Sequence, residues 1–262
     1  MKNTKLVMIA WAAAALALSA MAAPYVVLPN GQRIDGSAIR ALSNGDINLT
    51  TASGIRTFAR GSYARAVADK PAEFDQAVAA LNARKYDDAI RLLQGVVARF
   101  RFLNWDVEAS KLLPQALVGK GNAEEAVKAY ESLFQMAPNE RQNPESAWGM
   151  RRAMLAAKQY PALLRQLDAV AASGSRPDAA RAQIMRGDIQ TAQNDITQAA
   201  LDYLRTAILF DDVKDAEIQG EAHFKAAQAL EALRHSNAKD LYRRLVAKFP
   251  SSSYAAQARG KL

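Results

Sequence analysis

A repeating pattern of helix-forming segments constrains this chain more than any other feature. From Pro71 to the C-terminus, a small or apolar residue recurs about every 37 residues, each time after a turn and a polar helix start. Acidic residues favour a helix N-terminus, and a small residue lets a second helix approach the first closely. The pattern predicts about five helix pairs and a C-terminal capping helix within residues 71–262. The equivalent positions are Ala89, Ala126, Leu163, Ala199 and Ala238.

The residues around these positions resemble the tetratricopeptide repeat (TPR) family. The family's turn glycine, second-helix alanine, second-helix aromatic residue and closing proline correspond to Gly121, Ala126, Tyr130 and Pro138. The last unit repeats three of these four positions, with Ala238, Tyr242 and Pro250. The resemblance implies a mainly α fold, a right-handed TPR-like solenoid of helix pairs that binds other proteins.

The C-terminal segment 249–255 also resembles the ending of periplasmic TPR proteins such as the Tol-Pal-associated cell-division coordinator. In the TPR family the first helix of each pair lines a concave groove. The resemblance therefore places the partner-binding groove at Lys111, Gln115, Trp148, Arg152, Arg181, Asp188 and His223. Trp148 also stands at the family's large first-helix position, so a role in the core is the alternative for this residue.

The N-terminus carries an export pattern. Lys2 and Lys5 precede an uncharged apolar run from Leu6 to Leu18, and Ala20 and Ala22 form an A-x-A cleavage site. The pattern predicts a signal peptide over residues 1–22 and a periplasmic protein. Secretion and an uncleaved inner-membrane anchor are the alternatives, because residues 6–23 are uncharged and long enough to cross a bilayer. Membrane association is expected only in the uncleaved case.

Residues 24–68 differ in character from the rest and predict a small antiparallel β (SH3-like) module. Four or five short β-rich runs lie between Tyr25 and Phe58, separated by turn signals such as Pro29-Asn30-Gly31. Residues 47–51 alternate apolar and polar side chains, as a half-buried strand does. Such a small sheet buries little apolar area alone, so we expect it to pack on the helices as a cap.

Composition and motifs argue against catalysis. The chain has no cysteine, and its two histidines, His223 and His235, do not have the spacing of a zinc motif. No nucleotide-binding or nucleophile motif is present, so we expect no enzyme activity, no metal and no cofactor. The net charge of +8 falls to +6 without Lys2 and Lys5 and is spread along the chain, which does not favour nucleic acid as a partner.

The sequence therefore predicts a periplasmic scaffold or adaptor that binds proteins or peptides of the cell envelope in the groove. Two other functions remain open at this stage. One is a structural envelope component that self-associates, and the other is cell-wall glycan binding through the β module. The oligomeric state does not follow from the residues.

Overall fold

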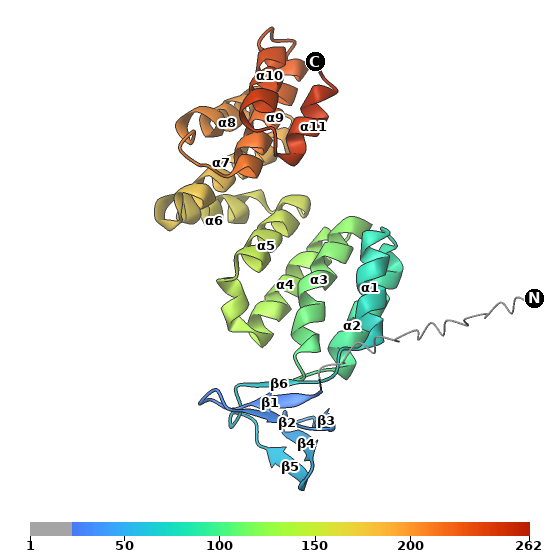
Figure 1. Ribbon diagram of the computed structural model, residues 1–262. Coiled ribbons are helices and arrows are strands. Elements are labelled where there is room, and N and C mark those ends of the chain that lie inside the picture. Colours follow the sequence, from blue (N-terminus) through green and yellow to red (C-terminus); the bar gives the residue numbers. More distant parts are fainter. Residues whose placement is uncertain (1–22) are drawn as a thin grey trace, which may run out of the picture. The chain divides into compact units, whose positions relative to one another are not determined.

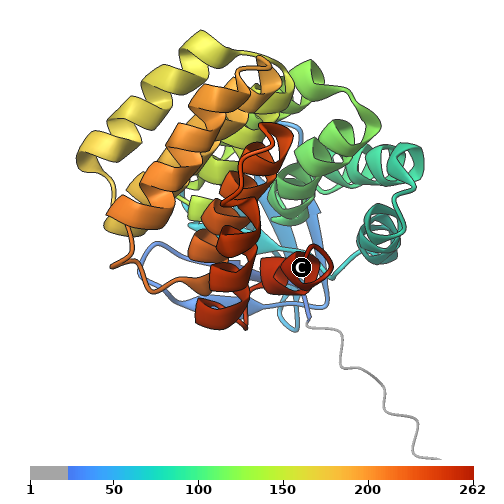
Figure 2. The ribbon, with the colours of Figure 1, turned by 90° about the horizontal axis from the view of Figure 1, so that it is seen from above.

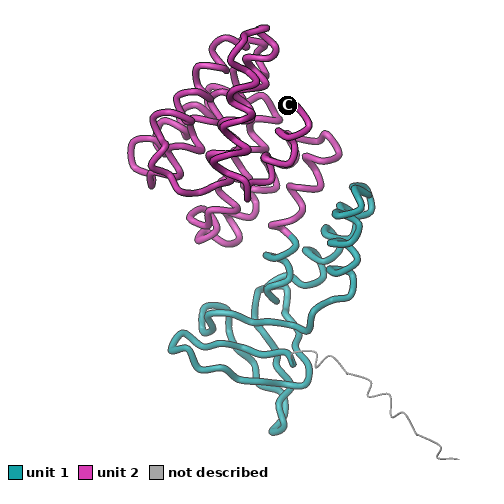
Figure 3. The backbone as a smooth tube through the Cα atoms, turned by 45° about the horizontal axis from the view of Figure 1, so that its top comes forward, with its two compact units in different colours: residues 1–109 teal, residues 110–262 magenta. Residues whose placement is uncertain are grey.

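The computed structural model describes residues 23–262, so the predicted signal peptide, residues 1–22, lies outside the described part. The chain forms two compact units that meet in the sequence between Ala109 and Ser110 (Figure 3). This boundary falls within helix α3 (Trp105–Lys120). The first unit therefore contains helices as well as the strands of the β module.

The β module consists of two antiparallel three-stranded sheets, ordered β2-β1-β6 and β3-β4-β5. In β4 the side chains of Ile47 and Leu49 are fully buried, which confirms the alternation predicted for this strand. The strands are β1 (Tyr25–Val27), β2 (Arg33–Asp35), β3 (Ala38–Ala41), β4 (Ile47–Thr51), β5 (Gly54–Phe58) and β6 (Arg65–Val67).

Strand β6 is one that the sequence pattern did not predict. It is three residues long and pairs with β1, with Ala66 opposite Val26. A run this short carries no period of its own, and its partner lies some forty positions away in the chain. Long-range pairing therefore creates this strand, and the pairing buries both Val26 and Ala66.

The core of the β module includes the turn that follows the second helix. Phe100, Phe102, Leu103 and Trp105 pack against the buried strand residues. The Trp105 ring N–H donates a hydrogen bond of 2.8 Å to the carbonyl of Ala68. Within the first unit the module thus packs on the turn that precedes α3, through Phe100 and Phe102, and on the start of α3, through Trp105.

Within residues 23–262, ten α-helices form five consecutive pairs, and an eleventh, α11, follows the last pair (Figure 1). In the second unit successive helices from α6 to α10 lie side by side (Figure 2). The helices besides α3 are α1 (Ala72–Asn82), α2 (Tyr86–Arg99), α4 (Ala123–Met136), α5 (Pro144–Ala156), α6 (Tyr160–Ser173), α7 (Arg176–Ala192), α8 (Ile196–Leu209), α9 (Ala216–Ala232), α10 (Ala238–Lys248) and α11 (Ser253–Arg259), with a short 3-10 helix η1 (Pro138–Arg141).

The turn inside each pair has the same backbone geometry. One residue in every turn has a positive φ, between 55° and 94°. A left-handed residue is a common way to end a helix, and glycine adopts it with the least strain. Here Gly121 occupies the position once, and other residues occupy it in the remaining four turns. These residues are Arg84, Lys158, Asn194 and Arg234.

All five residues that the repeat pattern aligned are buried, as expected for contacts between the helices of a stack. Glycines of the first helices make further close contacts. A side chain at Gly187 of α7 would meet the ring of Tyr203 in α8, and one at Gly149 of α5 would meet Tyr130 in α4. The predicted fold class is confirmed: the chain is mainly α-helical and TPR-like, with small antiparallel sheets at its N-terminal end.

Replacing Gly187 with alanine is expected to destabilise the second unit. The new Cβ would lie 2.6 Å from Cδ1 of the buried Tyr203, which cannot move aside without disturbing its neighbours. Overpacking of this kind costs about 1–3 kcal/mol. Urea unfolding followed by circular dichroism would measure the loss.

Gly95 of α2 is the matched control, because a Cβ there meets no atom within 4 Å. Gly95→Ala should raise stability by about 0.5–1 kcal/mol through its helix propensity. Equal effects of the two substitutions would contradict the close contact between α7 and α8.

Candidate functional site: a concave pocket on the first helices

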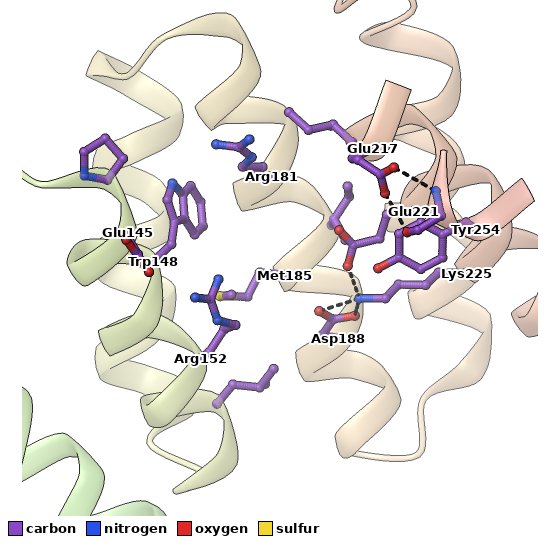
Figure 4. A pocket seen from close by; sticks show the side chains of 15 residues that line it. Glu145, Trp148, Arg152, Arg181, Met185, Asp188, Glu217, Glu221, Lys225 and Tyr254 are labelled. Atoms are coloured by element: carbon purple, nitrogen blue, oxygen red, sulfur yellow. Dashed lines mark hydrogen bonds and ion pairs between the residues drawn. The ribbon is translucent and has the colours of Figure 1, made fainter. Parts of the chain in front are cut away.

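A pocket of about 690 Å³ opens on the second unit, and its walls come from α5, α7, α9 and α11 (Figure 4). Three of these are the first helices of consecutive pairs, the elements that the TPR resemblance assigns to a groove. The lining residues are Pro144, Glu145, Trp148, Arg152, Leu155, Arg181, Ile184, Met185, Asp188, Glu217, Ile218, Glu221, Lys225, Ser253 and Tyr254.

The floor of the pocket is apolar and fixed in place. Trp148, Ile184 and Met185 contribute to it, and all three are less than 10% exposed. The Trp148 ring N–H donates a 3.2 Å hydrogen bond to Oδ1 of Asp178. Trp148 is therefore a buried packing residue, which was the alternative considered for it, and it also lines the pocket.

One wall carries a network of paired charges. The Lys225 ammonium contacts Asp188 at 2.7 Å and Glu221 at 2.6 Å. Asp188 also accepts a 2.8 Å hydrogen bond from the hydroxyl of Tyr203. Burial on its own lowers the pKa of Lys225, but the two carboxylates outweigh it and raise that pKa above its ordinary value. The lysine thus stays charged and is held by its partners.

Glu217 attaches the last helix to this wall. Its carboxylate accepts hydrogen bonds from the backbone N–H and the hydroxyl of Ser253, both at 2.7 Å. These bonds, that of the Ser253 hydroxyl first, lower the pKa of Glu217. A carboxylate at a helix N-terminus also interacts favourably with the helix dipole. The interaction fixes α11, so that Tyr254 borders the pocket (Figure 4).

The opposite wall, on α5, differs because its charged side chains are exposed and unpaired among the described residues. Arg152 and Glu145 are exposed, and among residues 23–262 neither side chain makes an ion pair. Arg181, on α7, is bound instead to Asp215 at 3.3 Å. An incoming group would therefore find a free guanidinium at Arg152 and an already satisfied network on the facing helices.

The structure brings four of the seven sequence-predicted site residues together. Trp148, Arg152, Arg181 and Asp188 all line the pocket. Lys111 and Gln115 lie on α3 and do not line it, and Lys111 contacts the buried carboxylate of Glu140 at 3.1 Å.

The structure contradicts the prediction that His223 lines the groove. It is 7% exposed, its Nδ1 lies 2.8 Å from the carbonyl oxygen of Gln219, and its ring packs on Phe249. His223 therefore belongs to the interior rather than to the groove. The reason is helical register: on α9 the pocket-facing residues are 217, 218, 221 and 225, spaced by three or four, and position 223 points elsewhere.

Sequence reasoning missed several pocket residues. Glu221 and Lys225 stand four apart on α9, an arrangement that marks a common helix face and was a usable signal. Tyr254 gave no such signal, because it reaches the pocket through the packing of α11. Within the described residues no group of three or more metal-binding side chains occurs, and no helix is long and apolar enough to cross a membrane.

Comparison with known proteins supports the repeat assignment at one place in the chain. A family model described as "Tetratricopeptide repeat" matches residues 221–252, which include most of α9 and all of α10. No curated protein matches the chain.

Two solved structures are similar in arrangement. MamA 41-end from Desulfovibrio magneticus RS-1 is 18% identical, with a TM-score of 0.45, over 67% of this chain and 92% of that chain. A putative kinesin light chain of nearly identical TPR-like repeats from Podosopora anserina is 17% identical, with a TM-score of 0.49, over the same shares. The TPR-like assignment rests on the five helix pairs and the matched repeat. Such a fold suggests a protein–protein interaction scaffold.

The buried His223 is expected to make stability depend on pH. Burial lowers its pKa, and the neighbouring Lys248 and Arg244 act in the same direction. The unfolded chain therefore binds the proton at a higher pH than the folded chain does. The contribution of the neutral His223 to the free energy of unfolding is fully present above about pH 6.5, the ordinary pKa of histidine. It is lost as the pH falls below that pKa toward the lower pKa of the folded state. Urea unfolding between pH 7.5 and 5.5 would measure the decline.

In that experiment His223→Gln should flatten the decline, and His235→Gln should leave it unchanged, because His235 is exposed. A decline of the same size in the His223 variant would show that other groups cause it.

Proposed function

We propose that this protein is a non-catalytic adaptor of the bacterial cell envelope that holds a segment of a partner protein in the concave pocket. The observation that carries the proposal is the convergence of three first helices and α11 on one open pocket with an apolar floor. Its charged wall is internally paired, so binding requires little reorganisation of the scaffold.

The chemistry of the two walls indicates the kind of partner segment. An apolar side chain would pack on Trp148 and Met185, and an acidic side chain would pair with the open guanidinium of Arg152. Such a segment would be short and extended or helical, as in other groove-binding complexes. The proposed place in the envelope follows the resemblance to periplasmic TPR proteins, including the Tol-Pal-associated coordinator.

Self-association is a second candidate, favoured by an apolar patch on the last-but-one pair. Ile208 and Leu209 at the end of α8 are 64% and 60% exposed, and Leu201 of the same helix is 45% exposed. Large apolar side chains gathered on one helix are typical of interaction surfaces. A mass that rises with protein concentration in sedimentation would favour this candidate.

Export to the periplasm is a further part of the proposal and rests on the N-terminal pattern. Expression of the full chain in a Gram-negative host is expected to yield a soluble periplasmic protein that begins at Ala23. Ala22→Lys should block processing by changing the residue before the cleavage site. Mass spectrometry of the fractionated protein checks the start at Ala23 in the wild type and the blocked processing in Ala22→Lys. A cytoplasmic chain that begins at Met1 would contradict export.

Binding through the pocket can be tested by affinity capture from solubilised envelope with residues 23–262 as bait. The β module stays in the bait, because its removal would expose Phe100, Phe102 and Trp105. Arg152→Glu reverses the open charge of the pocket and is expected to weaken capture of the specific partner by about tenfold or more.

Arg165→Glu is the matched control for this capture. Arg165 is an exposed arginine on α6, outside the pocket, and carries the same change of charge. Proteins retained by the wild type and the control but lost with Arg152→Glu would support the adaptor. Identical sets from all three baits, or no specific protein at all, would contradict it.

A further inference from the structure

A second hollow lies away from the concave pocket, between the end of α4, η1, α5 and α6. It measures about 520 Å³, and an adjoining hollow of about 360 Å³ shares four of its residues. Two of the shared residues are arginines, Arg141 and Arg151. The larger hollow shares no lining residue with the concave pocket, and the adjoining one shares only Pro144 and Trp148 with it.

Arg151 is in an unusual state for a charged side chain. It is half-buried, its guanidinium lies 4.7 Å from the centre of the Trp148 ring, and burial lowers its pKa. Its Nε is buried and, among residues 23–262, has no hydrogen-bond partner. A half-buried charge with no counter-charge bonded to it is unfavourable, so an anion that pairs with the part of the guanidinium lining the hollow would bind there with a gain in free energy.

The neighbouring carboxylate does not satisfy this arginine. Asp178 accepts the Trp148 N–H through Oδ1 and the Ser175 hydroxyl through Oδ2, at 3.2 Å and 2.6 Å. It influences Arg151 through its charge but makes no hydrogen bond to it. The first of these bonds holds the tryptophan ring that the Arg151 guanidinium contacts, and the second holds Asp178 itself.

Arg141 supplies a second guanidinium at the same hollow. It is exposed at the end of η1 and lies 5.3 Å from the ring centre of Phe134. Glu131 also lines the hollow, but the described residues show no ion pair between its exposed carboxylate and either arginine. Two cations, each close to an aromatic ring, thus line the same hollow.

We propose that Arg141 and Arg151 form an anion site that takes an oxyanion, either a phosphate or a carboxylate group. The planar guanidinium matches both groups with paired N–H donors, and its position on an aromatic ring leaves those donors available. Trp148 borders both this site and the concave pocket, yet the two use different arginines, since Arg152 lines the concave pocket.

The Arg151 Nε–Hε resonance in a proton–nitrogen correlation spectrum reports on this site directly. Residues 23–262 would be titrated with inorganic phosphate and, separately, with acetate, at an ionic strength held constant with sodium chloride. The resonance should move and saturate with at least one probe. The probe that saturates at the lower concentration identifies the source as a phosphate or a carboxylate group.

Arg151→Gln should weaken the binding of that probe by about tenfold or more, as followed on the Arg141 resonance. Arg152→Gln, one residue along the same helix, should leave it unchanged. Failure of both probes to produce a saturating shift in the wild type would overturn the proposal, whether or not the variants fold. Undiminished binding in a folded Arg151→Gln variant would overturn it as well. Either result leaves the adaptor function untouched, because the capture experiment depends on Arg152.

Discussion

The close approach of paired helices at small residues is the contact on which the rest of the molecule depends. Ala89, Ala126 and Ala199 are fully buried where each second helix begins to pack, and glycines such as Gly187 accept an aromatic ring against the bare backbone. Because small residues leave room for close packing at these contacts, the packing fixes the spacing of the helices. Repetition of this spacing sets the first helices of successive pairs side by side, and those helices make the concave pocket.

The pocket combines a rigid wall with an open one. Lys225, Asp188 and Glu221 satisfy one another, so that wall contributes shape and leaves little charge to offer a partner. Arg152 on the facing helix is exposed and keeps its charge available. A preorganised wall lowers the entropic cost of binding, and the unpaired charges of Arg152 and Glu145 orient a partner. This division of roles suits the scaffold proposed above.

Trp148 connects the pocket with the anion site proposed on the other side of α5. Its ring forms part of the pocket floor, supports the Arg151 guanidinium and is itself held by Asp178. The β module is integrated in a comparable way, because its core is completed by Phe102 from the turn after α2 and by Trp105 at the start of α3. In both places an aromatic side chain joins elements that the repeat pattern alone would treat as separate.

The sequence by itself determined the helical repeat, its period, the β character of the N-terminal segment and four of the pocket residues. The repeat, its period and the β character follow from local rules: small residues at a fixed interval, polar helix starts and a period of two or 3.6. The four pocket residues followed from the resemblance to the TPR family. Tertiary structure alone decided the rest. Strand β6 exists through pairing with the distant β1, His223 is buried by its register on α9, and Tyr254 reaches the pocket through the bond of Glu217 to α11. Such features depend on contacts between segments that are far apart in the sequence, and a local sequence pattern does not specify those contacts.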